Sequence, residues 1–93
     1  MWIPILIRVF LACLLFQADA TEDILKQAID LHQRGDTAGA IEAYKKYLAV
    51  RPDSPLALSN LGAAYSRAGR YQDAVEEYKL ALKLQPEIGR AHV

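Results

Sequence analysis

Apolar and small side chains recur at helical spacing in two separate runs between residues 55 and 86. The first run consists of Leu58, Leu61, Gly62 and Tyr65. The second run consists of Ala74, Val75, Tyr78, Ala81 and Leu82, and Gly69 lies between the two runs. Because steps of three and four residues return to the same side of a helix, each run marks one apolar helix face. The pattern predicts two short amphipathic helices, joined by a tight turn and packed against each other.

The same pattern occurs 34 residues earlier in the chain. The matching pairs include Gly35 and Gly69, Tyr44 and Tyr78, and Pro52 and Pro86. A match at a fixed period of this length is typical of stacked structural repeats. We therefore predict an all-α fold in which helical hairpins stack as a short α-solenoid, with one repeat over residues 21–54 and a second over residues 55–88.

The second repeat contains the motif Leu58-x2-Leu61-Gly62-x2-Tyr65, followed by Ala74-x3-Tyr78 and then Pro86. This order of residues resembles the tetratricopeptide repeat pattern W-x2-L-G-x2-Y…A-x3-F…P. The resemblance implies that the first helices of successive repeats line a concave groove, which binds peptides or partner proteins.

By that resemblance, ten residues are expected in the groove. They are Glu22, Leu25, Ile29, His32 and Gln33 in the first repeat, and Leu56, Ser59, Ala63, Ser66 and Arg67 in the second. An alternative is that Leu25, Ile29 and Leu56 only pack against a neighbouring helix. Some family members hold a C-terminal carboxylate with lysines and asparagines in this groove. Asn60 matches one such position, whereas Leu25 and Ile29 stand where that arrangement would need polar residues.

Local signals place the ends of the expected helices. Gly35 should stop a helix that covers about residues 22–34, and Asp36 can cap the next one. Pro52 disfavours helix at the residue before it, so the second helix should end near Arg51. Ser54 can cap the third helix, with Pro55 at its first position, where no amide donor is needed.

Small residues predict where the helices approach closely. Gly62 and Ala74 occupy these positions in the second repeat, and Ala28 and Ala40 match them in the first. The first repeat is the less faithful copy, because Gln27, Thr37 and Tyr47 stand where the second repeat has Leu61, Tyr71 and Ala81. We therefore expect looser packing in the first repeat.

Residues 1–20 have the features of a secretory signal peptide. Arg8 supplies positive charge, residues 9–16 form an apolar run, and Ala18-Asp19-Ala20 offers small residues for cleavage. Cys13 fits as a small apolar residue within that run. The competing interpretation is an uncleaved membrane anchor, but the apolar run is shorter than the roughly 20 residues that span a bilayer. We expect an exported protein, either periplasmic or secreted; the alternative is anchoring in a membrane by residues 1–20.

The C-terminal end of the sequence has two interpretations. Residues 89–93 are either the truncated start of a third repeat or a non-native tail, because residues 88–93 match one reading frame of a common sequencing-library adapter. We expect the genomic coding sequence to diverge at about Ile88 and to complete a third repeat. In the segment 21–93 alone, Val75 and Leu82 would stay uncovered, so we expect marginal stability or self-association.

Charge and chemistry narrow the functional class. The formal net charge is zero, and no basic stretch favours nucleic acid. The chain has one cysteine and two histidines, His32 and His92, and nothing in the sequence brings three or four metal ligands together. We find no catalytic constellation and expect neither enzymatic activity nor a cofactor. The sequence predicts an exported protein that binds other proteins. The alternative is the N-terminal repeat region of a larger exported enzyme or envelope assembly factor.

The signal peptide interpretation gives a direct prediction. We expect cleavage between Ala20 and Thr21, because the small residues before this bond and the start of the repeat register coincide there. N-terminal sequencing of the exported protein should begin at Thr21. Exported protein that still began at Met1 would contradict the prediction.

Overall fold

The computed structural model describes residues 20–86, and this part of the chain is all-helical. The first helix is described over residues 20–33, followed by α2 (Thr37–Val50), α3 (Pro55–Arg67) and α4 (Tyr71–Leu84). Apart from Ala20, the predicted signal peptide lies outside the described residues, as does the tail over residues 89–93. Over residues 20–86, no helix combines the length and the apolar character needed to cross a membrane.

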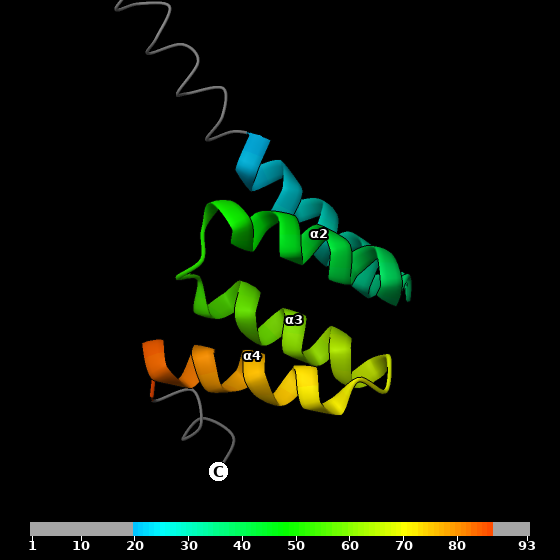
Figure 1. Cartoon of the computed structure of the whole chain (residues 1–93). Coiled ribbons are helices and arrows are strands. Elements are labelled where there is room, and N and C mark those ends of the chain that lie inside the picture. Colours follow the sequence, from blue (N-terminus) through cyan, green and yellow to red (C-terminus); the bar gives the residue numbers. More distant parts are fainter. Residues whose placement is uncertain (1–19, 87–93) are drawn as a thin grey trace, which may run out of the picture.

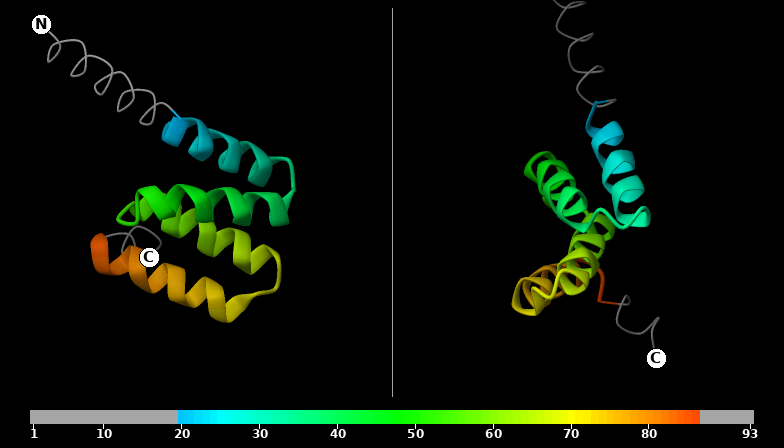
Figure 2. Two further views of the ribbon diagram at one scale, coloured as in Figure 1. Left: turned by 45° about the horizontal axis from the view of Figure 1, so that its top comes forward. Right: turned by 90° about the vertical axis from the view of Figure 1, so that its right-hand side faces the viewer.

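The four helices stack in chain order as two hairpins. Figure 1 shows each helix running back beside the one before it. In the end-on view of Figure 2 the helices alternate between two sides, with the first helix and α3 on one side and α2 and α4 on the other. Helix α3 packs against α2 and α4, the helices before and after it in the chain. The predicted arrangement of helical hairpins in a short solenoid is therefore present in the described residues.

The turn inside each hairpin is built in the same way. Gly35 and Gly69 have φ values of +86° and +80°, a left-handed conformation that glycine adopts without a steric penalty. In the first turn the Asp36 N–H donates to the Leu31 carbonyl oxygen at 2.9 Å; in the second the Arg70 N–H donates to the Tyr65 carbonyl oxygen at 2.8 Å. These bonds satisfy carbonyl groups that the end of a helix leaves without partners.

The predicted caps are also confirmed. The Asp36 side chain accepts a hydrogen bond from the Gly39 N–H at 3.0 Å, so it caps the start of α2. The Ser54 hydroxyl accepts from the Ala57 N–H at 3.2 Å, and Pro55 is the first residue of α3. The helix α2 ends at Val50, directly before Arg51-Pro52. Each side-chain cap is worth about 1 kcal/mol.

A core of small and aromatic residues holds the helices together. Tyr44 and Leu61 are its largest fully buried side chains. Each of the four helices also contributes alanine to the core. These residues are Ala28, Ala40, Ala43, Ala64 and Ala74. The expectation that Ala28, Ala40 and Ala74 lie at close contacts agrees with their burial.

Gly62 marks the closest approach of α3 to α4. A β-carbon placed on Gly62 would lie only 2.9–3.1 Å from three ring atoms of Tyr78. Such separations are shorter than carbon–carbon contacts normally allow, so the Tyr78 ring occupies the space that a larger residue at position 62 would need. The close approach predicted for this glycine is therefore present.

The two repeats differ in how well their second helices are covered. On α2, Ile41 and Tyr44 are 4% and 1% exposed. On α4, the matching residues Val75 and Tyr78 are 47% and 38% exposed. The expectation of looser packing in the first repeat is therefore wrong for its second helix. Coverage depends on the next helix: α3 packs on α2, and no described helix packs on the corresponding face of α4.

The contact of Gly62 with Tyr78 leads to a stability prediction. We expect Gly62→Val to lower the free energy of unfolding by about 1–3 kcal/mol, because the added carbons would overlap the Tyr78 ring. In the Tyr78→Ala background the ring is absent, so the same substitution should cost much less. Urea denaturation followed by circular dichroism measures both costs. Equal losses in the two backgrounds would contradict the assigned contact.

Candidate peptide-binding groove

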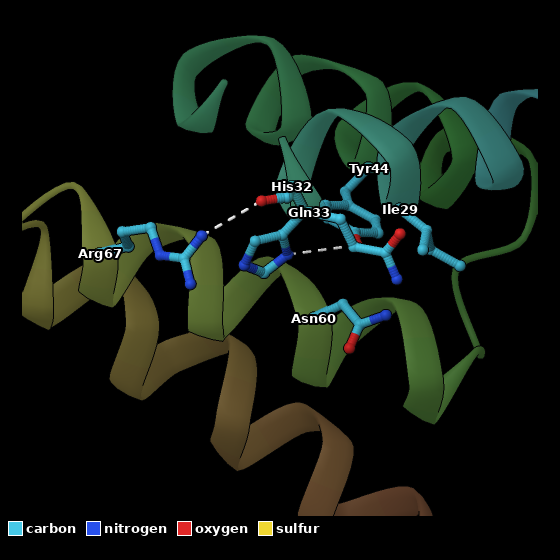
Figure 3. Close-up of a pocket in the computed structure, with 6 residues that line it drawn as sticks. All are labelled: Ile29, His32, Gln33, Tyr44, Asn60 and Arg67. Atoms are coloured by element: carbon cyan, nitrogen blue, oxygen red, sulfur yellow. Dashed lines mark hydrogen bonds between the residues drawn. The ribbon is translucent and has the colours of Figure 1, made fainter. Parts of the chain in front are cut away.

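A pocket of about 350 Å³ opens between the first helix and α3, on the side of the solenoid where the groove was predicted. The side chains that line it come from three helices (Figure 3). They are Ile29, His32 and Gln33 from the first helix, Tyr44 from α2, and Asn60 and Arg67 from α3. Repeat stacking therefore creates this pocket, because a single hairpin supplies only part of its wall.

Tyr44 forms the base of the pocket. Its hydroxyl oxygen lies 3.4 Å from Nδ1 of His32, and the two rings meet edge to face with centroids 6.0 Å apart. The Asn60 side chain lines the same pocket. Burial raises the pKa of Tyr44, an effect that the Asn60 side chain partly offsets. The Tyr44 hydroxyl consequently stays protonated at neutral pH, and it links α2 to His32 of the first helix.

Arg67 closes one end of the pocket. Its Nη1 donates a hydrogen bond to the His32 carbonyl oxygen at 3.1 Å. Since this carbonyl belongs to the last turn of the first helix, the guanidinium group lies at the negative end of the helix dipole. Burial and, to a smaller extent, the Arg67 charge lower the pKa of His32. His32 is therefore mainly neutral at pH 7.

The pocket suits a peptide chemically. Arg67 supplies a fixed positive charge, and none of the lining residues within the described part of the chain carries a carboxylate group. Guanidinium and amide N–H groups are good donors to carbonyl or carboxylate oxygens, while Ile29 offers an apolar contact. A site of this kind can hold a peptide through its backbone and one apolar side chain.

The structure brings four of the predicted groove residues together in this pocket: Ile29, His32, Gln33 and Arg67. Leu56 and Ser59 instead line a second hollow of about 380 Å³, together with Ser54, Pro55 and Gln85. Ala63 and Ser66 are half-buried on α3, and Glu22 is exposed on the first helix. These last three residues line neither hollow.

The alternative that the apolar groove residues only pack against neighbours holds in part. Leu25 and Ile29 are partly buried and pack against the core, and Ile29 also lines the pocket. Leu56 is 57% exposed. Leu25 is therefore mainly a packing residue, Ile29 serves both roles, and the exposed surface of Leu56 remains open to contact.

Two pocket residues were absent from the groove predicted from sequence. Tyr44 is a core residue with 1% exposure, yet it also lines the pocket. Asn60 was recognised only as a match to one carboxylate-binding position. A stronger signal was available, because Asn60 is a polar side chain spaced with the buried residues Ala57, Leu61 and Ala64 on one face of α3. A polar residue in such a place needs a hydrogen-bond partner.

The stacked hairpins define a helical-repeat protein with a groove on one side. A family model described as "Tetratricopeptide repeat" matches residues 25–87. The chain therefore belongs to the tetratricopeptide repeat family.

Individual relatives agree with this assignment. The chain is 40% identical over 57 residues to "Small glutamine-rich tetratricopeptide repeat-containing protein 2" of Mycosarcoma maydis. The matched segment covers 61% of the chain and 16% of that protein. It is 31% identical to "Photosystem I assembly protein Ycf3" of Prochlorococcus marinus, over 75% of the chain and 49% of the relative. The crystal structure of the Sgt2 TPR domain from Aspergillus fumigatus superposes with a TM-score of 0.69 at 29% identity, covering 73% of this chain and 45% of that one.

The environment of His32 predicts a pH effect. Its pKa in the folded protein lies below the ordinary value of 6.5, so the unfolded chain binds a proton more readily. As the pH falls below 6.5 towards the folded pKa, His32 should therefore reduce stability. We expect the wild type to lose more stability than the His32→Gln variant over this range, measured by urea denaturation. Parallel pH profiles for the two proteins would contradict this.

Proposed function

We propose that this chain is a protein-interaction module that binds a peptide segment of a partner protein in its concave groove. The bound segment would place an apolar side chain against Ile29 and direct backbone or carboxylate oxygens towards Asn60 and Arg67. The proposal needs no cofactor and no catalytic residue. Membership of the tetratricopeptide repeat family supports protein binding as the general role.

One observation carries the proposal. The pocket lies where the two repeats meet, and the donor groups of Asn60 and Arg67 line it together with Ile29. Arg67 is exposed and donates through Nη1 to the His32 carbonyl oxygen, so the other N–H groups of its guanidinium can reach a ligand. A pocket that combines convergent donors with an apolar wall is typical of a ligand-binding site.

We further propose that the protein acts outside the cytoplasm, in the periplasm or in secreted form. The support for this is the sequence of residues 1–20, with its positive charge, apolar run and small residues before Thr21. Retention in a membrane by this segment is the alternative.

A second candidate is that these repeats form the N-terminal region of a larger exported enzyme or envelope assembly factor. The observation that favours it is coverage, because the chain spans 16% and 49% of the two curated relatives described above. In that case the groove would recruit a partner to a further domain. The groove proposal is common to both candidates.

The groove can be tested without knowing the partner. We would select peptides from a random-sequence phage library on the wild-type chain and measure the affinity of one synthetic hit by fluorescence anisotropy. Removing one charged donor from a buried contact typically weakens binding by tenfold or more, so we expect about this loss for Arg67→Ala. Ile29→Asp should weaken binding similarly by removing the apolar wall.

A matched control is Arg51→Ala, which removes an exposed arginine just after α2 and outside the pocket. This variant should bind the peptide as the wild type does. Selected peptides whose affinity is unchanged by Arg67→Ala and Ile29→Asp would contradict the groove proposal. Selection that yields no binding peptide would also count against it.

A further inference from the structure

His32 and Arg67 place two groups that can carry positive charge side by side in the groove pocket. Nη1 of Arg67 donates to the main-chain carbonyl oxygen of His32 at 3.1 Å, so the guanidinium group is tied to the residue whose imidazole lines the same pocket. Figure 3 shows the imidazole between the Arg67 side chain and Tyr44. A charge on the imidazole would therefore lie next to the permanent charge of Arg67.

The two ring nitrogens of His32 have different surroundings. Nδ1 lies 3.4 Å from the Tyr44 hydroxyl oxygen. Nε2 is on the other side of the ring, which faces Arg67 (Figure 3). A protonated imidazole donates from both nitrogens. Protonation therefore keeps the contact with Tyr44, because Nδ1–H can donate to the hydroxyl oxygen, and it makes Nε2 a charged donor beside Arg67.

His32 is the group that changes the charge of this pocket near neutral pH. The charged or titratable side chains that line the pocket with it are Tyr44 from α2 and Arg67 from α3. Burial raises the pKa of Tyr44 and arginine stays protonated, so neither changes its charge between about pH 5 and pH 7.5. On the same helix as His32, Asp30 and Arg34 are exposed, line no part of the pocket and form an ion pair with each other.

The pocket has no counter-charge of its own for a protonated His32. Burial and the nearby Arg67 lower the pKa of His32, and none of the described lining residues carries a carboxylate group. A ligand carboxylate between Nε2 and the guanidinium group would supply the missing negative charge. An opposite charge within about 4–6 Å typically shifts a pKa by about 1–3 in favour of the charged form. The bound carboxylate and the proton on His32 would therefore stabilise each other.

We propose that His32 and Arg67 together bind a carboxylate group of the peptide, and that acidification strengthens this binding by protonating His32. The inference rests on the proposed function, because the carboxylate belongs to the peptide held in the groove. It comes either from an aspartate or glutamate side chain or from the C-terminus. Asn60 is the pocket residue that matches a carboxylate-binding position of some family members, and the His32–Arg67 pair is separate from it. His32 thus makes the preference for acidic over amide-bearing peptides depend on pH.

The direction of the pH effect follows from the pKa of His32 in the free and in the bound protein. In the free protein this pKa lies below the ordinary value of 6.5. A bound carboxylate raises it, so the complex binds a proton more readily than the free protein does. The affinity should therefore increase as the pH falls through the bound pKa, and it should level off below the free pKa. A pKa difference of about one corresponds to about tenfold in affinity.

The test uses the full 93-residue chain and three short peptides as probes. Two of them, acetyl-Ala-Leu-Ala-Asp-Ala-amide and its Asn counterpart, differ only in the charge of one side chain. The third, acetyl-Ala-Leu-Ala-Ala, has a free C-terminal carboxylate. NMR titrations at equal ionic strength measure each affinity at about pH 7.5 and about pH 5, where peptide carboxylates remain mostly ionised.

We expect a carboxylate peptide to bind about tenfold more tightly at the lower pH, and the Asn peptide to show no such gain. A gain with either carboxylate peptide supports the proposal, and the peptide that shows it identifies the source of the carboxylate. His32→Gln removes the titrating group and should abolish the gain. The matched control, Asp30→Asn, removes a titratable group of the same helix that lies outside the pocket, and it should keep the gain.

The ring signals of His32 give a second measurement, which needs no variant. Binding of a carboxylate peptide should raise the pKa of His32 by about one. A His32 pKa that the peptide leaves unchanged or lowers would overturn the proposal. So would an equal gain for the Asn peptide, a gain that persists in His32→Gln, or the absence of binding by both carboxylate peptides. In each of these cases, a phage-selected peptide that requires Ile29 and Arg67 would still support the proposed function.

Discussion

The structure depends on one interaction: the apolar face of α2 is covered by α3, the helix that follows it in the chain. This packing buries Ile41 and Tyr44 almost completely. Burying an aliphatic side chain such as that of Ile41 contributes about 1.5–3 kcal/mol to the stability of the fold. The alanines and Gly62 make the coverage possible because they let the helix axes approach, and the tight turns at Gly35 and Gly69 bring each hairpin partner into place.

The groove is a consequence of the same stacking. When α3 packs against α2, it also brings Asn60 and Arg67 to the end of the first helix, where they meet His32 and the Tyr44 hydroxyl. Tyr44 therefore belongs both to the core, through its ring, and to the pocket, through its oxygen. A substitution that loosens the helix stack would alter the groove even if it changed no groove residue. The stability of the fold and the shape of the binding site are thus coupled through a few shared side chains.

Much of this fold follows from local sequence signals. The glycine turns, the caps at Asp36 and Ser54 and the 34-residue period depend on short-range chemistry, and each is present in the structure. The exposed fraction of a side chain does not follow from these local signals. Tyr44 and Tyr78 have the same place in the repeat, yet one is 1% exposed and the other 38%. Periodicity shows which face of a helix is apolar, but coverage is decided by a neighbour that lies elsewhere in the chain.

The pocket shows the same distinction. The resemblance to the tetratricopeptide repeat implied that His32, Gln33 and Arg67 lie on the groove side, and all three line the pocket. The hydrogen bond between His32 and Tyr44 joins residues of different helices, and no local pattern specifies that pairing.

Hydrogen exchange of backbone amides in the native protein tests the central claim most directly, because it reports the stability of each helix separately. If coverage by the next helix determines stability, the amides of α2 and α3 should be the most protected, and those of α4 should exchange faster. Protection that is equal in α4 and α2 would contradict the account.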